Sequence, residues 1–427
     1  MFKTKIIPLA LLLSCFGAHS ASLSITGNQR FGSNMFVNMD LDRGQRSDSG
    51  NTSSFLEHRI LLRPDILIDE HFTVKTEWNL LQLNQRPTGP TTTAERFGSS
   101  LDSRSGFSDD TNYIEVSRAY LQWSSDWGIF YFGRMPKTWG LGLMYDSGDN
   151  PLDDYSTTVD RMAYQSLLGS LELIVAYEKG EEGTLNNDDD DMDVFEGSLE
   201  YANPEAKFNI GLLYSRKVRS ADSYEGSILG RKSSHEMSLF LKKQWSEFFV
   251  GSEFVTQSYD KQSNVTGWLG QISWTPGNFI MDLDLAYSNF SGDRSFEFNR
   301  NYRPFLIMFR QTTGVTSDER ETRTGGPVGG VEGNGTGGGV MLSKLGLGYK
   351  FSDGRYVLRS DVGYAQFEEQ GTSSGNELGV EWDMSFDQQW YKNFHTQYAF
   401  GVLFPGDGYG PDARLGWGLQ LRGYLEF

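Results

Sequence analysis

The chain has 427 residues with a single cysteine, and its formal net charge at pH 7 is −18. Loss of the two lysines in the leader described next takes this charge to −20 (−18 − 2). Such an acidic chain lacks the basic surface that nucleic-acid binding requires, so no nucleic-acid partner is expected. Because Cys15 lies in the leader, neither disulfides nor thiolate metal sites are expected in the mature chain.

Residues 1–20 have the pattern of a secretory signal peptide. Two lysines precede an apolar run, and a cut after Ser20 is the preferred cleavage. The alternative is a lipoprotein signal, in which Cys15 would carry the lipid. We predict a cleaved signal peptide at 1–20 and one barrel domain at 21–427.

The rest of the sequence excludes membrane-spanning helices. No stretch after residue 20 approaches the roughly 18 consecutive apolar residues that such a helix needs. The other structure that can cross a membrane with its backbone hydrogen bonds satisfied is a closed β-barrel. No linker or change of composition divides the chain, which indicates a single domain.

Alternation of apolar and polar side chains predicts strands along the whole chain. We predict an all-β fold, a transmembrane antiparallel β-barrel of about 18 strands, with about 16 as the alternative count. The predicted strands are 22–42, 54–68, 72–85, 112–125, 128–136, 160–169, 171–180, 193–203, 206–218, 234–245, 248–260, 264–275, 279–291, 340–352, 355–369, 376–389, 394–405 and 415–427.

Short and long connections alternate between these strands. Short periplasmic turns and long extracellular loops are typical of bacterial outer-membrane barrels, and so is an aromatic girdle at the membrane boundary. We therefore expect outer-membrane lipid and lipopolysaccharide to surround the barrel. The aromatic residues at or beside predicted short turns are Phe72, Trp127, Tyr201, Trp245, Trp274, Phe351 and Trp390.

The last predicted strand, Leu415–Phe427, alternates large apolar residues with polar or small ones and ends on an aromatic carboxylate. It resembles the closing strand of bacterial outer-membrane barrels. The resemblance implies that the barrel assembly machinery recognises this strand during biogenesis.

Charged side chains opposite the apolar face are predicted to line the lumen. In one interpretation they pair across neighbouring strands and only solvate the wall. In the other, a subset sets an electric field across a narrowing. The predicted lumen-wall residues are Glu57, Arg59, Arg63, Lys75, Glu77, Asp282, Asp284, Arg359, Asp361, Glu381, Asp383 and Arg422.

The long connection 137–159 is rich in glycines and carboxylates, which favours a loop folded back into the barrel. We expect Trp139 to pack it there, and Arg134 or Arg161 to meet Asp153, Asp154 or Asp160. The alternative is an ordinary external loop. The predicted constriction residues are Arg134, Trp139, Asp153, Asp154, Asp160 and Arg161.

The connection 292–339 contains the apolar run Phe305–Phe309. Loops this long are usually functional or disordered. We predict that the apolar run anchors the loop inside the barrel mouth, and that Gly325–Gly339 is a mobile stretch.

No motif indicates catalysis. Gly333–Gly338 matches a nucleotide-binding pattern, but no buried strand precedes it and no helix follows. The acidic run Asp188–Asp193 lacks the spacing of a calcium loop, and the histidines lack zinc-binding spacing. We expect no enzyme activity, no cofactor and no metal. A Ser–His pair across strands, as in a barrel hydrolase, is the enzymatic alternative.

Two stretches, Gly133–Arg161 and Asn301–Arg310, are similar to a family of largely uncharacterised barrel-like outer-membrane proteins of deltaproteobacteria and predatory bacteria. A more distant resemblance is to the alginate-export porins, which implies a passive channel for an anionic sugar polymer. The sequence departs from that pattern because acids outnumber bases on its inward face, so the resemblance does not predict that this chain has the same substrate.

These observations predict an outer-membrane porin-like channel for passive diffusion of small hydrophilic solutes, constricted by an inward-folded loop. The alternative from another class is a structural or surface-interaction barrel closed by its own loops. An alginate-export-like polysaccharide channel and a barrel hydrolase are further alternatives.

Overall fold

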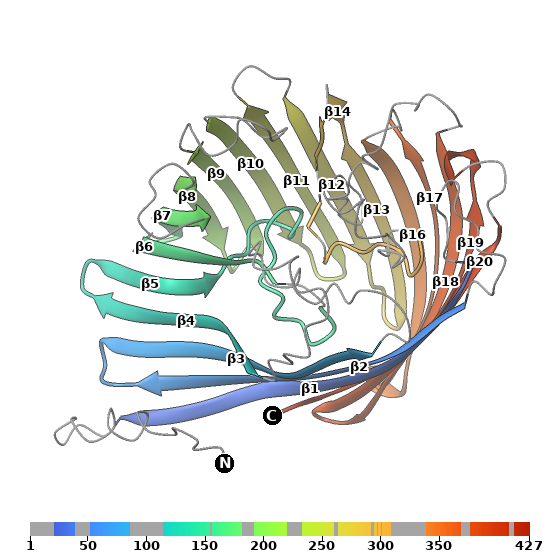
Figure 1. The fold of residues 1–427 in the computed structure, drawn as a ribbon, viewed down its shortest axis with the longest axis horizontal. Helices are drawn as coiled ribbons and strands as arrows, with labels where there is room; N and C mark the ends of the chain where they lie inside the picture. The colour runs from blue at the N-terminus through green and yellow to red at the C-terminus, as the bar shows by residue number, and fades with distance from the viewer. Residues whose placement is uncertain are drawn as a thin grey trace, which may run out of the picture.

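Eighteen strands form one antiparallel sheet that closes on itself, because β1 (Ser22–Val37) pairs with both β2 (Thr52–Leu67) and β20 (Gly416–Glu426) (Figure 1). The predicted fold class and strand count are therefore confirmed. This computed structural model describes residues 21–38, 52–85, 114–153, 156–181, 192–219, 233–259, 264–291, 294–296, 298–299, 301–308, 339–368, 376–409 and 414–427.

The strand bounds lie within a few residues of the predicted ones, and the predicted part of the first strand beyond residue 38 lies outside the described residues. The other strands of the barrel are β3 (Phe72–Gln85), β4 (Ile114–Ser125), β5 (Gly128–Pro136), β6 (Thr158–Leu168), β7 (Leu171–Glu181), β8 (Met192–Asn203), β9 (Phe208–Arg219), β10 (Ser233–Gln244), β11 (Phe248–Tyr259), β12 (Val265–Trp274), β13 (Phe279–Ser288), β16 (Val340–Phe351), β17 (Tyr356–Phe367), β18 (Glu377–Tyr391) and β19 (Phe394–Pro405).

Three smaller elements complete the described secondary structure. A two-residue hairpin, β14 (Phe290–Ser291) with β15 (Arg294–Ser295), stands apart from the barrel sheet. Two single-turn helices, η3 (Ser352–Gly354) and η4 (Asp407–Tyr409), lie in connections. Within the described part of the chain, no helix is long and apolar enough to cross a membrane.

Period-two alternation gives each strand an apolar outer face and a mostly polar inner face. On β1, Phe31 and Met35 are exposed on the outside, whereas Arg30 and Asn34, each next to one of them in sequence, are buried inside. The exposed apolar residues continue around the ring, as a lipid-facing belt requires. At the end of the barrel that carries the short turns, Trp127, Trp245 and Trp390 and other aromatic side chains are exposed, as a membrane-boundary girdle would be.

Two connections fold inward and pack inside the ring of strands (Figure 1). We call them the β5–β6 segment (described residues 137–153 and 156–157) and the β15–β16 segment (described residues 296, 298–299 and 301–308). Both contribute to a cluster of buried apolar side chains inside the barrel, which includes Leu143, Phe296, Phe305 and Ile307. A barrel of this size would otherwise enclose an aqueous channel, so these segments determine how much of the lumen stays open.

Glycines in the wall give the inward segments room to pack closely. A Cβ placed on Gly363 would lie 2.1 Å from Cζ of Phe305, and one on Gly267 would lie 2.2 Å from the ring of Phe296. Heavy atoms cannot approach that closely, so a side chain at either position would displace the aromatic ring. These glycines therefore act as sockets for the β15–β16 segment.

Gly363→Ala is expected to lower the free energy of unfolding by about 1–3 kcal/mol, because overpacking would shift Phe305 from its socket. Denaturant unfolding of the protein in detergent micelles measures this loss. Gly197→Ala on β8 is the matched control, since a Cβ there meets nothing within 4 Å. Equal losses for the two variants would contradict the socket.

Candidate pore constriction

The β5–β6 segment leaves the wall from a closed hairpin. Pro136 pairs with Thr158 at the end of the β5–β6 ladder, and the Lys137 N–H donates to the carbonyl oxygen of Thr157 at 2.9 Å. The residues between these two positions therefore project from the hairpin into the barrel without interrupting the sheet.

A balanced group of buried charges fixes the start of the segment. Lys137 Nζ lies 3.1 Å from Oε1 of Glu178 and also contacts the carboxylate of Glu196. Arg161 Nη1 lies 3.2 Å from Glu178 and 3.3 Å from Glu196. Two cations thus face two carboxylates, and each buried charge has the partners that offset its loss of hydration.

Aromatic side chains hold the segment against β10. The Trp139 indole N–H donates to Oγ of Ser238 at 2.8 Å, and its ring meets Phe240 edge-on at 4.9 Å. The Tyr145 hydroxyl donates to Oε1 of Glu236 at 2.7 Å. Burial raises the pKa of Tyr145 well above its ordinary value, and the negative charge of Glu236 adds to this shift, so the hydroxyl remains a donor.

A buried carboxylate on β11 holds the backbone of the segment. Oε2 of Glu253 accepts the N–H of Leu141 at 2.6 Å and the N–H of Leu143 at 3.2 Å. These N–H groups have left the β-ladder, so burial would be costly if the carboxylate did not accept them.

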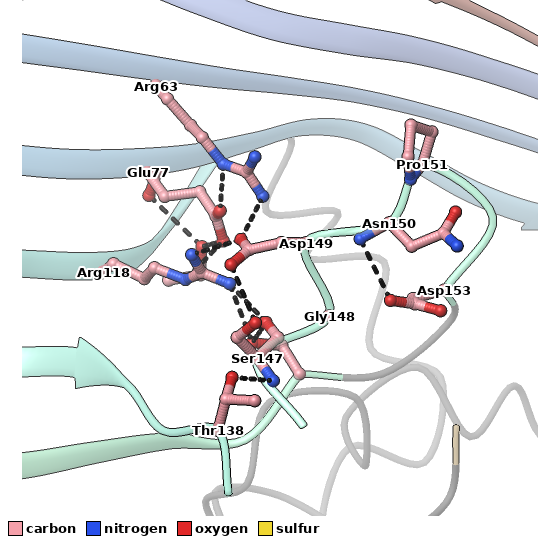
Figure 2. A network of polar contacts seen from close by, with 12 residues as sticks. Arg63, Glu77, Arg118, Thr138, Ser147, Gly148, Asp149, Asn150, Pro151 and Asp153 are labelled. Carbon is pink, nitrogen blue, oxygen red and sulfur yellow. Dashed lines mark hydrogen bonds and ion pairs between the residues drawn. The ribbon is translucent and has the colours of Figure 1, made fainter. Parts of the chain in front are cut away.

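At the tip of the segment, two arginines of the wall hold Asp149 (Figure 2). Arg63 Nη2 and Arg118 Nη1 each donate to Oδ1 of Asp149 at 2.8 Å. Behind them Glu77 accepts the Arg63 Nε–H at 2.8 Å and lies 3.3 Å from Nε of Arg118. The side chain of Asp149 is 53% exposed and that of Arg118 only 7%, so the wall residues are the fixed part of this contact.

The arginine pair changes the acidity of the loop carboxyl. Burial alone would raise the pKa of Asp149, but the charge of Arg118 and the hydrogen bond from Ser147 outweigh it and lower the pKa. Ionised Asp149 therefore stabilises the folded segment above its ordinary pKa of 3.8, and this contribution is lost as the pH falls through the lowered value.

Asp149→Asn is expected to lower stability at neutral pH, and the difference from the wild type should shrink as the pH falls through the lowered pKa of Asp149. Thermal unfolding of both proteins across this range measures the difference. A difference that stays constant down to the lowest pH would contradict a role for the ionised carboxylate.

Three further arginines hold the main chain of the tip. Arg30 and Arg59 donate at 2.9 Å to the carbonyl oxygen of residue 153, and Arg422 donates at 3.2 Å to that of residue 152. Arg30 and Arg59 also reach the carbonyl oxygen of residue 151. The wall from β20 to β4 thus presents five arginines to this tip.

The β15–β16 segment is held by carboxylates of β18. Glu381 accepts the N–H of Ile307 and the N–H of Met308, both at 2.6 Å. Asp383 accepts the N–H of Leu306 at 3.0 Å. These contacts place the first four residues of the predicted apolar anchor inside the barrel; Phe309 and most of the predicted mobile stretch lie outside the described residues.

The two segments meet inside the barrel. The Asn299 N–H donates to the carbonyl oxygen of Leu143 at 2.7 Å, and its side-chain amide donates to Oγ1 of Thr157 at 3.1 Å. The amide of Asn301 donates to Oδ1 of Asp146 at 3.2 Å. The segments therefore form one body that bridges the wall at β11 to the wall at β18.

Charge is distributed unevenly around the wall. The arginine-rich side runs from β20 to β4, whereas carboxylates predominate between β13 and β18. There Arg359 lies 2.7 Å from Asp282 and 3.2 Å from Asp361, and Lys344 lies 2.9 Å from Asp284. Of these pairs, Lys344–Asp284 joins neighbouring strands, Arg359–Asp361 lies along β17, and Arg359–Asp282 reaches across β16 to β13. Lys75 is half-buried and opposite Asp65 in the β2–β3 register.

Two predicted constriction residues lie on the wrong face. Arg134 donates to both oxygens of Asp160, at 2.8 and 2.5 Å, but the pair faces outward. Met135 is buried inside the barrel, so its neighbour Arg134 shares the outer face with exposed Phe132. The predicted strand 128–136 already contained Arg134, and its alternation with Met135 places the arginine on the outer face.

Other predicted constriction residues have different partners from those expected. Arg161 lies in the lumen but contacts Glu178 of β7 and Glu196 of β8 instead of one of the expected aspartates. Asp153 meets the wall through its carbonyl oxygen. Trp139 packs inside the barrel, and Asp154 lies outside the described residues.

Several residues that hold the segments were not singled out from sequence. All lie on the inward parity of their strands, so the alternation that assigned Glu57 and Glu77 could have found them. No group of three potential metal ligands is close enough to hold an ion among the described residues. The residues that hold the segments and were not singled out from sequence are Arg30, Arg118, Glu178, Glu196 and Glu236.

Comparisons with known proteins support the fold. No protein-family model matches the sequence, and no curated protein matches it significantly. The chain is similar to the solved structure of OccK9 (OpdG) from Pseudomonas aeruginosa, with 13% identity and a TM-score of 0.57 over 96% of this chain and 99% of that one. It is also similar to a BenF-like porin from Pseudomonas fluorescens Pf-5, with 10% identity and a TM-score of 0.56 over 96% and 98%.

A third similar structure is Pseudomonas aeruginosa OpdK with vanillate, at 11% identity and a TM-score of 0.55 over 95% of this chain and 98% of that one. At such low identity these likenesses show the fold alone. They support a porin-like barrel. They do not support the sequence resemblance to the deltaproteobacterial family or to the alginate-export porins.

Proposed function

We propose that this protein is an outer-membrane channel for passive diffusion of small hydrophilic solutes, constricted by the β5–β6 and β15–β16 segments. The observation that carries the proposal is that both segments are fixed to the inner wall and joined through Asn299. Such a channel needs neither catalysis nor a cofactor. We include in the proposal a cleaved signal peptide, folding by the barrel assembly machinery and contact with lipopolysaccharide.

Polar groups beside the joined segments would replace the hydration of a passing solute. On the arginine-rich side, Asp149 and Arg63 keep partly exposed side chains, and Arg359 does so on the acidic side. A solute that passes between these sides would meet both signs of charge. We therefore expect the channel to admit small polar solutes and to disfavour large solutes and apolar solutes.

A second candidate is a surface-interaction barrel closed by its loops. The observation that favours it is the apolar cluster inside the barrel, where Leu143, Phe296 and Phe305 are almost fully buried. An apolar plug supported by wall glycines would block solutes. The long external connections would then carry the function.

Conductance separates the two candidates. Purified protein in planar lipid bilayers should give discrete current steps if it is a channel, and liposomes that contain it should swell in small neutral sugars. Heat-unfolded protein is the control in both assays. Silent bilayers and no swelling, obtained with protein whose gel mobility still shifts on heating, would reject the channel and support the closed barrel.

A further inference from the structure

A hydrogen-bonded polar pair lies on the outer, lipid-facing surface of the barrel. The amide Nε2 of Gln29 on β1 lies 3.0 Å from Nε2 of His58 on β2. Gln29 has the outward parity of Phe31, which is 43% exposed and opposite His58 in the strand register. Leu56, two residues before His58 on the same face, is 61% exposed. The pair is thus enclosed by apolar side chains of the membrane belt.

Other hydrogen-bonded polar pairs on the outer surface, such as Arg134–Asp160 and Tyr214–His235, lie close to the strand ends that carry the long connections. Further examples are hydroxyl groups. Ser252, Ser360 and Thr396 each accept an indole N–H, at 2.9, 2.8 and 3.0 Å respectively. A hydroxyl group that accepts an indole N–H exposes few hydrogen-bonding groups without a partner to the lipid. An amide and an imidazole expose more of them, and unmet polar groups are costly in hydrocarbon.

The groups left over by this pair are self-complementary. In the observed orientation the amide donates and Nε2 of His58 accepts, so the Gln29 oxygen remains as an acceptor and the His58 Nδ1–H as a donor. With the amide turned over and the other tautomer, a donor and an acceptor again remain. Lipid tails supply neither. A second copy of the same surface supplies both, through two equivalent bonds about a twofold axis.

We propose that the outer face of β1 and β2 around Gln29 and His58 is an interface between two copies of this chain in the membrane. Ser33, four residues from Gln29 on the same face, is exposed and small enough to let the strands of two copies approach. The interface does not depend on whether the barrel conducts. It rests only on the outward pair and the surface around it.

Cross-linking in native membranes tests the interface. Apart from Cys15 in the predicted leader the chain has no cysteine, so Ser33→Cys gives a single reactive thiol. A short bis-maleimide should join two Ser33→Cys chains. Ser343→Cys is the matched control, because it places the same change on the outer face of β16, away from β1 and β2. Equal cross-linking of the two variants, or none with either, would overturn the proposal.

A second measurement tests the polar pair itself. In the Ser33→Cys background, Gln29→Leu with His58→Leu should lower the association constant about tenfold, as expected from the loss of two membrane hydrogen bonds. Heat-dependent gel mobility checks that this variant still forms the barrel. Unchanged association would also overturn the proposal, because the pair carries it. Purification of a monomer with lipopolysaccharide bound at this face would overturn the proposal as well. If the double variant fails to fold, the Ser33→Cys cross-linking experiment, in which Gln29 and His58 are unchanged, still tests the interface.

Discussion

Replacing residues 139–155 by a short glycine turn is expected to raise single-channel conductance several-fold. The hairpin tolerates the change, because the Lys137 N–H already bonds the Thr157 carbonyl oxygen at 2.9 Å. The replacement removes Trp139, Asp149 and the arginine-bound tip from the lumen. A ring of 18 strands is wide enough for an aqueous channel once a loop no longer fills it.

The variant should still fold, because the wall charges that lose partners would become hydrated. Lys137 is retained, so its buried group with Glu178 and Glu196 stays balanced. Asp149→Asn is the control within the same segment, and it should change conductance far less because the rest of the segment stays in place. Unchanged conductance in a folded replacement variant would show that the β5–β6 segment does not limit the current.

The barrel could be predicted because its rules are local. Alternation along each strand assigns two faces from neighbouring residues alone, and short turns mark the strand ends. The same rule identified Glu57, Arg63 and Arg422 as inward-facing. It was not applied at Arg134, which lies inside the predicted strand 128–136 and was nevertheless assigned to the constriction.

The contacts that hold the inward segments could not be predicted in this way. Glu253 binds the backbone of Leu141, 112 positions away, and Glu381 binds that of Ile307, 74 positions away. Each contact depends on the path of an irregular segment, for which no periodicity exists. From sequence, an inward-facing buried glutamate is expected to have a partner, but the partner is not identified. Backbone N–H groups are present in almost every residue, so the composition does not show which loop residue supplies them.

Glu381→Ala is expected to destabilise the protein by about 2–4 kcal/mol, because it leaves the N–H groups of Ile307 and Met308 buried without an acceptor. Glu381 also lies opposite Gly363, the socket of Phe305, so the apolar anchor would loosen with it. We expect a lower midpoint in urea unfolding and, in bilayers, a noisier and larger current.

Two comparisons show whether the effect comes from these bonds. Glu381→Gln keeps one carbonyl oxygen as an acceptor, so its loss should be intermediate. Glu172→Ala removes an inward glutamate of β7 that has no hydrogen bond among the described residues, and its effect should stay within about 0.5 kcal/mol. If Glu381→Ala were no worse than Glu172→Ala, the β15–β16 segment would be held by its apolar packing alone. The carboxylates of β18 would then only solvate the wall, as those of an open porin do.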